Sequence, residues 1–318
     1  MAITLLTRRC SRRALCRPNL IYYLWRFVAN GTRTGRALMS GASYNETQAI
    51  GQELTEQGIV VGLSDRFLTA DGQGALSQAA ARILHTSRSE HVEAVISGAA
   101  SNPECRKQFL THLVSYPDGM PPDDPLLKVA LDRKLLEIVS TYLGFWPCLH
   151  SIGAWLNYPT DAPPELSQLW HRDPEDLKLI KVFIYLVDVD ERCGPFTYIP
   201  RTHPFGAQAA AAKKLEKKKR LADDRMIRIF PPESWRVCTG PANTMILADT
   251  IGYHRGGKPI VGRRILISFT YTSGTPITGR PLGIRGNPEW LTSDIQRLAV
   301  RWLPDARPSS RKRKARKN

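Results

Sequence analysis

The sequence predicts a mainly β fold with flanking α-helices, in which an antiparallel sandwich or barrel follows a helical N-terminal part. Two observations indicate this class. Before about residue 145, apolar residues recur every three or four positions, as they do along one face of a helix. From Cys148 onward, apolar residues occur in short runs separated by glycine- and proline-containing turns, which is typical of strands.

The helical part is expected to begin near Ser43, where a capped amphipathic segment starts that Gly58 closes. The segment after Gly58, Ile59–Val61, is β-branched and apolar, so we expect a strand there. Helices are expected over 44–56, 70–84, 89–98 and 126–143.

The β part is expected to contain six short strands. They cover 150–158, 181–188, 197–199, 235–238, 244–248 and 264–271. A basic, alanine-rich stretch, 206–225, interrupts them and is expected to form a surface helix. A terminal helix is expected over 288–303.

These elements predict one domain between two basic ends. The domain spans 43–303 and consists of a helical part (43–145), a β part (146–275) and a C-terminal segment (276–303). A basic N-terminal extension (1–42) precedes it, and a basic disordered tail (304–318) follows it.

The net charge of +16 belongs mainly to the ends of the chain. Residues 1–45 hold eight arginines and no acidic residue, and 301–318 hold eight basic residues against Asp305. Between them lie 29 basic and 28 acidic residues. Blocks of like charge are usually solvated tails, and contact with nucleic acid or an anionic membrane surface is the alternative.

The sequence favours a cytoplasmic protein. No apolar stretch approaches the roughly 20 residues that span a bilayer. The six cysteines form no C-x-x-C pair and are expected to be reduced thiols. The arginine-rich start leaves two alternatives open, an organelle-targeting segment and an amphipathic membrane-surface stretch around 20–28.

The strongest chemical pattern is His171-Arg172-Asp173, followed some eighty positions later by His254. Alternate residues of a strand point to the same side, so His171 and Asp173 can both face one metal ion. His254 follows the apolar run Met245–Ala248, where a strand is expected to end. Two histidines and one carboxylate form the facial triad of non-haem Fe(II) oxygenases, although zinc or another divalent ion also accepts such ligands.

Arg264 opens a strand ten residues after His254. A buried arginine there can bind a carboxylate through its planar pair of donors. Arg263 is the rival, because strand alternation allows only one of the two side chains to face inward.

Several segments together resemble the phytanoyl-CoA dioxygenase-like family of Fe(II)- and 2-oxoglutarate-dependent oxygenases. The resemblance covers about 45–275. Trp170–Asp176 is similar to the family's H-x-D-x-x-D loop, and Lys181–Asp190 to its next strand and acidic turn. The other matches are Cys193–His203, which has Arg201 where the family usually has glycine, and Tyr253–Ser268.

The resemblance implies a double-stranded β-helix, a jelly-roll, cupin-like barrel with N-terminal helices around it. It implies Fe(II) and 2-oxoglutarate as cofactors and O2 as co-substrate. His171, Asp173 and His254 would hold the iron. Arg264 would bind the far carboxylate of 2-oxoglutarate, and Ser268, on the same face of the strand, would add a hydrogen bond.

Four further residues are candidate contacts. Asn157 and Tyr158 lie on the strand before the ligand loop, where such sites often place cofactor or substrate contacts; simple packing is the alternative. We assign Asn157 to the cofactor and Tyr158 to the substrate. Trp170 and Arg172 flank the iron ligands and are expected to line the substrate mouth.

The resulting functional hypothesis is hydroxylation of an unactivated C–H bond in a small-molecule or carrier-linked substrate. Asp173 argues against a halogenase, because that chemistry needs the carboxylate position vacant for a halide. Two alternatives stay open: an oxygenase acting on nucleic acid or another macromolecule recruited by the basic tails, and a cupin-like metal-binding or sensor protein without turnover. No CoA-binding element is visible, so the family name is not a substrate assignment.

Overall fold

The computed structural model describes residues 20–39, 45–100, 109–116, 119–215, 219–286 and 288–303. The expected tail, 304–318, lies outside these residues. Within them, no helix is long and apolar enough to cross a membrane. Three cysteines of this part of the chain, Cys148, Cys193 and Cys238, are free thiols.

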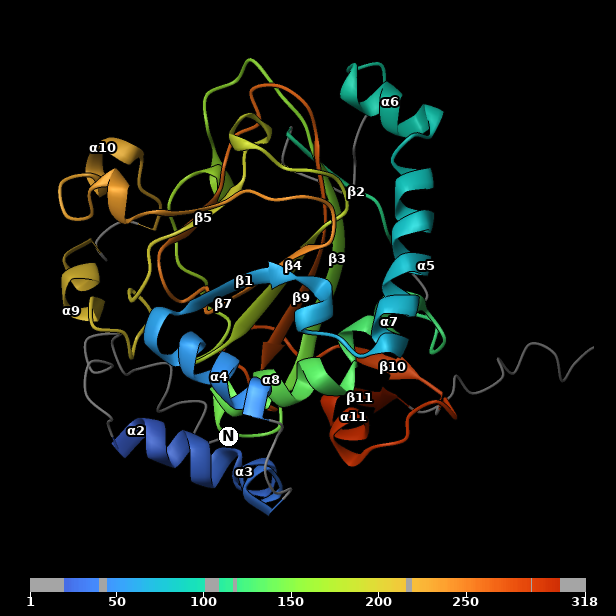
Figure 1. Ribbon diagram of the computed structural model, residues 1–318, viewed down its shortest axis with the longest axis vertical. Helices are drawn as coiled ribbons and strands as arrows, with labels where there is room; N and C mark the ends of the chain where they lie inside the picture. Colours follow the sequence, from blue (N-terminus) through green and yellow to red (C-terminus); the bar gives the residue numbers. More distant parts are fainter. Residues whose placement is uncertain are drawn as a thin grey trace, which may run out of the picture.

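A six-stranded antiparallel sheet forms the centre of the molecule (Figure 1). Its strands, in spatial order, are β1 (Ile59–Leu63), β7 (Thr244–Ala248), β4 (Ile180–Tyr185), β9 (Arg264–Thr272), β3 (Cys148–Asn157) and β2 (Leu110–His112). The long pairing of β3 with β9 aligns Asn157 with Arg264.

A second, three-stranded antiparallel sheet consists of β6 (Arg236–Cys238), β5 (Phe196–Tyr198) and β8 (His254–Gly256), in that order. An isolated antiparallel bridge between His171 and His254 adds residues 170–173, which we call the ligand segment, beside β8. Apolar residues of both sheets share one cluster, including Tyr185 and Leu266 from the large sheet and Phe196 and Tyr198 from the small one. The two sheets therefore pack face to face.

The strand order is that of a jelly roll. When the chain is counted from β3 and the ligand segment is taken as the second strand, the large sheet reads six, three, eight, one. The small sheet then reads two, seven, four, five. Two interlocked Greek keys give this order. The predicted mainly β jelly roll with flanking helices is confirmed, and β1 and β2 extend its large sheet at the two edges.

The large sheet has one face toward the helices and one toward the small sheet. On β4, Ile180, Val182 and Ile184 pack into the core shared with the helices. Phe183 and Tyr185 alternate with them and pack between the sheets. Functional side chains of this sheet must come from the second face, because the first is closed by helices.

Helices α4 (Asn45–Gln57), α5 (Ala70–Thr86), α6 (Glu90–Ile96), α7 (Pro125–Ala130) and α8 (Arg133–Leu143) follow the predicted ranges, with one difference. The segment expected as one helix, 126–143, is two, because Asp132 interrupts it and caps α8 by accepting from the amide of Leu135. In Figure 1, α4 and α8 lie below the sheet and α5 beside it.

The predicted N-terminal extension differs from the structure. Residues 20–39 form α2 (Leu20–Tyr23), a π-helical turn (Leu24–Ala29) and α3 (Gly31–Met39). Trp25 is only 3% exposed and packs edge-on against Phe145. Arg33 donates to the carbonyls of Trp146 and Pro147. This segment belongs to the packed domain, so the expected start near Ser43 is too late.

The stretch 206–225 was expected to be one helix, and this prediction is wrong. Its described residues, 206–215 and 219–225, form α9 (Ala209–Ala212), a 3-10 turn (Lys213–Leu215) and the start of α10 (Asp223–Met226), with turns between them. Instead of a periodic apolar face, its apolar residues Ala212, Leu221 and Met226 join a small cluster with Trp170. We call residues 204–234 the insert.

The C-terminal segment also differs from the single helix expected. It contains β10 (Gly283–Arg285), α11 (Asp294–Ala299) and β11 (Arg301–Leu303), with β10 and β11 paired in parallel. The remaining short elements are 3-10 turns at Ser64–Arg66, Leu166–Gln168, Glu191–Cys193 and Pro232–Ser234. Arg201 has φ +65°, the left-handed conformation for which the family pattern uses glycine.

Asp132→Ala is expected to destabilise the helical layer. The buried carboxylate caps α8 and also accepts from the amide and hydroxyl of Thr69, the N-cap of α5. Losing one cap and leaving buried donors unpaired should lower the free energy of unfolding by about 2–4 kcal/mol. Urea unfolding measures this, with exposed Asp65→Ala as the control. Equal stability of the two variants would contradict the assignment.

Candidate functional site

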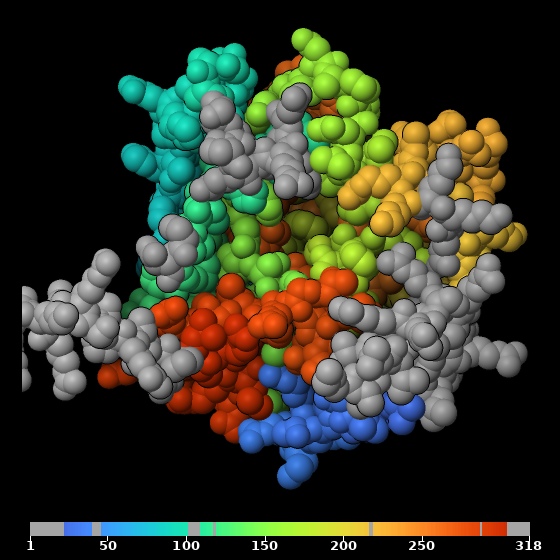
Figure 2. All heavy atoms as spheres, turned by 180° about the vertical axis from the view of Figure 1, so that it is seen from behind, coloured from blue at the N-terminus to red at the C-terminus, as the bar shows by residue number. Residues whose placement is uncertain are grey.

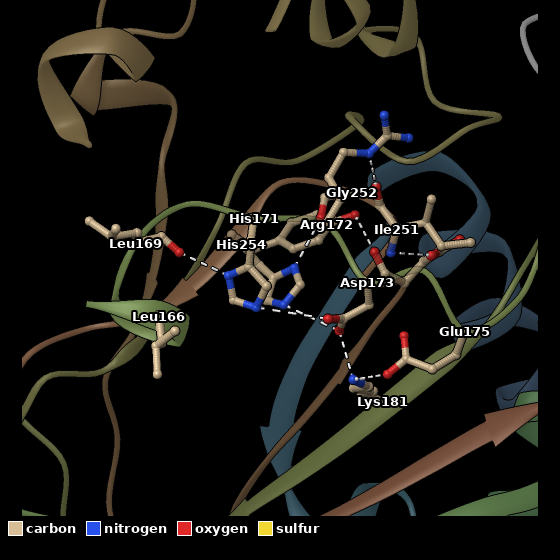
Figure 3. A network of polar contacts seen from close by, with 12 residues as sticks. Leu166, Leu169, His171, Arg172, Asp173, Glu175, Lys181, Ile251, Gly252 and His254 are labelled. Atoms are coloured by element: carbon tan, nitrogen blue, oxygen red, sulfur yellow. Dashed lines mark hydrogen bonds and ion pairs between the residues drawn. The ribbon is translucent and has the colours of Figure 1, made fainter. Parts of the chain in front are cut away.

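His171, Asp173 and His254 converge at one point between the two sheets (Figure 3). One ligand atom from each lies within 4.8 Å of the others. The Nε2 atoms of His171 and His254 lie 3.8 and 3.4 Å from the oxygens of Asp173. All three side chains are at least half-buried. These residues form a site that can hold a divalent metal ion.

Backbone hydrogen bonds align the ligands. His171 and His254 each donate an amide to the other's carbonyl, at 2.9 and 3.1 Å. The amide of Asp173 donates to the backbone carbonyl of Thr250 at 2.9 Å. Directly opposed residues of an antiparallel pair project to the same side, which explains the 4.2 Å between the two imidazole centroids.

The outer nitrogen of each imidazole is held by a carbonyl. His171 Nδ1 lies 2.8 Å from the carbonyl of Leu169, and His254 Nδ1 lies 3.0 Å from that of Gly252. A carbonyl only accepts, so each Nδ1 carries the proton and each Nε2 presents a lone pair to the metal. Burial, and then the charge of His254, lower the pKa of His171 to about 3, which keeps this imidazole neutral.

The turn before His254 is anchored by two buried tyrosines. Tyr142 donates its hydroxyl to the carboxylate of Asp249 at 2.6 Å, and Tyr198 donates to the Asp249 carbonyl at 3.0 Å. A Cβ on Gly252 would lie 2.1 Å from the Tyr198 hydroxyl, so only glycine fits there. The carbonyl that orients His254 is therefore rigidly placed.

Lys181 is a functional residue that the sequence interpretation missed. Its Nζ lies 2.7 Å from Asp173 Oδ2 and 2.9 Å from Glu175 Oε1. Burial alone would raise the pKa of Asp173, but Lys181 and the two imidazoles hold it well below its usual range. The carboxylate is thus ionised and ready to bind a cation. The sequence could have indicated this role, because the alternation of β4 places Lys181 on the same face as Phe183 and Tyr185, where a charged side chain needs a partner.

Arg264 lies on the face of β9 that the second sheet covers. It is 4% exposed, and its Nε and Nη1 groups have no hydrogen-bond partner. A Cβ on Gly256 of β8 would lie 3.0 Å from its Nη2, so the guanidinium reaches across to the small sheet. An unpaired buried cation is costly, and a bound carboxylate would satisfy it.

The structure resolves the rivalry between the two neighbouring arginines. Arg263 points outward and forms a two-pronged ion pair with Glu93, at 2.5 and 2.8 Å. Only Arg264 faces inward, as strand alternation requires.

The two other predicted cofactor contacts lie on the face of Arg264. Asn157 is its register partner on β3 and is buried. Ser268, four residues along β9, accepts a hydrogen bond from Trp155 Nε1 at 2.9 Å. Both positions fit the prediction of a cofactor contact, which stays a prediction.

The three predicted substrate contacts do not face the triad. Trp170 is fully buried against Trp235 and donates to Asp223, because it alternates with His171 and the insert covers it. Arg172 turns away, donates to the carbonyl of Ile251 and lies over the ring of Tyr253. Tyr158 packs in the core beneath the helices, on the face opposite Asn157. These positions argue against a substrate role for all three.

Comparisons with known proteins find similar solved structures but no similar sequence or family. No protein-family model matches the chain, and no curated protein matches its sequence. Among similar solved structures, EctD from S. alaskensis has a TM-score of 0.49 and 17% identity over 83% of this chain and 90% of its own.

Two further structures are similar. SnoN, a non-heme alpha ketoglutarate dependent epimerase from nogalamycin biosynthesis, has a TM-score of 0.46 and 14% identity over 74% of this chain and 85% of its own. ThoJ, a non-heme monooxygenase, has a TM-score of 0.44 and 18% identity over 84% of this chain and 91% of its own. At these values the likeness carries no argument, and the fold and site rest on the chain's own topology and geometry.

Lys181→Met is expected to destabilise the metal-free protein more than the metal-loaded one. Removing the ammonium leaves two carboxylates, Asp173 and Glu175, without their counter-charge, which typically costs about 3–5 kcal/mol for a buried pair. A bound divalent ion supplies positive charge at the same place. Addition of Mn(II) should therefore raise the melting temperature of this variant more than that of the wild type.

Lys258→Met is the matched control, because Lys258 donates to the carbonyl of Ala162 outside the triad. If Mn(II) stabilises the wild type and both variants by the same amount, Lys181 does not share charge with the metal site.

Proposed function

We propose that this protein is an Fe(II)- and 2-oxoglutarate-dependent oxygenase that hydroxylates a C–H bond of a small-molecule or carrier-linked substrate. The observation that carries the proposal is the combination of His171, Asp173 and His254 with a buried, unpaired Arg264 between the same two sheets. A metal site alone would fit a binding protein. A buried arginine without a partner, close to the metal site, fits an enzyme that binds a co-substrate with a carboxylate.

The metal site fits iron by the chemistry of its donors. His171, His254 and Asp173 offer two imidazole nitrogens and one carboxylate, a donor set that would hold Fe(II) and leave further ligand positions for small molecules. When bound, Fe(II) with 2-oxoglutarate and O2 supplies the oxidising chemistry that no side chain of the chain provides. The protein orients the ligands through Leu169 and Gly252 and keeps Asp173 charged through Lys181.

The surroundings of Arg264 fit a binding site for 2-oxoglutarate. The Nε and Nη1 groups of Arg264 have no hydrogen-bond partner, and its guanidinium can donate to the carboxylate at the far end of the co-substrate. Asn157 and Ser268 lie on the same face and would contribute polar contacts. The surrounding apolar side chains, among them Leu266 and Phe196, exclude water and strengthen this ion pair.

Turnover of 2-oxoglutarate tests the proposal. With Fe(II) and air, the wild type should form succinate, and Asp173→Ala should lose at least 100-fold of this rate. The loss follows from removing the anionic ligand of the metal. If the wild type binds Fe(II) but forms no succinate from 2-oxoglutarate, alone or with any added test substrate, the protein is instead a metal-binding or sensor protein.

Arg264→Leu should weaken 2-oxoglutarate binding about 30-fold or more while Mn(II) binding persists, because removing one member of a buried charge pair costs about 2–5 kcal/mol. Anaerobic titration calorimetry measures both constants. Arg263→Leu is the matched control, since the neighbouring side chain points outward to Glu93. Unchanged 2-oxoglutarate affinity in Arg264→Leu would remove Arg264 from the site.

A further inference from the structure

The insert adds a short edge to the small sheet, next to the metal ligands. Leu221 and Trp170 exchange two backbone hydrogen bonds, each of 2.9 Å. The ligand segment thus has β8 on one side and residues 220–221 of the insert on the other. In an antiparallel pair this register places Arg220 directly opposite His171.

The register determines the side to which Arg220 projects. His171, His254 and Tyr198 occupy one row across the small sheet, and all three face its interior side. Arg220 extends this row, whereas Leu221 and Trp170 alternate with it and pack in the cluster on the outer side. The Arg220 guanidinium is therefore presented beside His171. Burial lowers the pKa of Arg220, and the charge of Asp173 opposes this shift, which agrees with a position near the metal ligands.

The guanidinium of Arg220 is held by a hydrogen bond from one of its nitrogens. Its Nη1 donates to the carbonyl of Leu166 at 2.7 Å. Leu166 has φ +46°, a left-handed conformation that is costly for leucine, and its carbonyl also accepts from the amide of Leu169 at 3.2 Å. None of the other donors of Arg220 hydrogen-bonds to a residue that the structure describes. The Nε and Nη2 edge is free for a ligand.

The two segments that Arg220 links, the loop and the insert, border a hollow in the surface. Figure 2 shows a hollow between the lime-green loop 159–169, the gold part of the insert and the orange-red C-terminal segment. Leu166 belongs to this loop, and Arg220 links the loop to the insert. Arg220 itself is exposed.

Among the residues that the structure describes, no carboxylate forms an ion pair with Arg220. Lys181 is balanced by Glu175, and Arg264 with a divalent ion is balanced by Asp173 and the two carboxylates of 2-oxoglutarate. One positive charge remains, on Arg220. A substrate with a single negative charge would neutralise it.

We propose that Arg220 binds a carboxylate of the substrate, so that the substrate of this enzyme is an organic acid. The free edge of the guanidinium offers two parallel donors, which a planar carboxylate accepts in a two-pronged pair. The proposal rests on the proposed function and names the substrate class for the same site. Arg220 is a specificity-determining residue, because it selects substrates by charge and anchors them beside the metal ligands.

Binding of matched acids and amides tests this proposal. The protein is loaded anaerobically with Mn(II) and saturating 2-oxoglutarate, which occupies Arg264. Acetate, benzoate and hexanoate are then compared with acetamide, benzamide and hexanamide by ligand-observed NMR. Hydrogen bonds to a charged group contribute about 1.5–3 kcal/mol, so at least one acid should bind about 10-fold or more tightly than its amide.

Arg220→Gln should bring acid and amide to within about threefold of each other, and Arg220→Lys should keep part of the preference as a point charge. Arg225→Gln is the matched control, an exposed arginine of the same insert, and should behave like the wild type. Amides that bind as well as acids in the wild type, or a preference that survives Arg220→Gln or is lost in Arg225→Gln, would overturn the proposal.

Titration of 2-oxoglutarate separates this proposal from the previous one. If Arg220→Gln weakens 2-oxoglutarate binding itself, Arg220 serves the co-substrate and the inference is wrong, while the oxygenase proposal stands. If the wild type binds neither Mn(II) nor 2-oxoglutarate, the oxygenase proposal fails.

Discussion

The reciprocal backbone pairing of His171 with His254 is the constraint on which the site depends. It joins two segments some eighty residues apart and places both imidazoles on one side of the small sheet. The same pairing, continued by the Asp173 amide on Thr250, fixes the carboxylate opposite the two Nε2 atoms. Since the ligands are aligned by main-chain hydrogen bonds, the geometry exists before a metal ion binds, and the metal gains affinity because little ordering is needed.

Burial of charge is the second organising feature, and it is clearest for the two buried cations of the site, Lys181 and Arg264. Lys181 compensates Asp173 and Glu175 and keeps the ligand ionised. Arg264 is buried without a partner, which is unfavourable in the empty protein and favourable once an anion arrives. The unpaired Arg264 therefore lowers the stability of the empty protein and favours binding of an anion.

The insert shows how one segment can seal one side of a site and open another. Its outer-facing residues bury Trp170, so a tryptophan adjacent to a ligand becomes a structural residue. Its inner-facing Arg220 stands beside His171 and holds the strained Leu166 carbonyl. Alternation along a two-residue β-bridge thus assigns opposite roles to neighbouring side chains.

The sequence by itself determined an antiparallel β part behind a helical part and the three metal ligands as a set, because period-two alternation and ligand chemistry are local properties of the chain. The jelly roll was implied by the family resemblance, and only the structure decided that Arg264 rather than Arg263 faces inward. It did not determine which faces the second sheet and the insert would cover. Tyr158, Trp170 and Arg172 were therefore misplaced, and Lys181 and Arg220 were missed. Their roles depend on long-range register: Lys181 meets Asp173 only because β4 follows the ligand loop into the large sheet, and Arg220 meets His171 only because Leu221 pairs with Trp170.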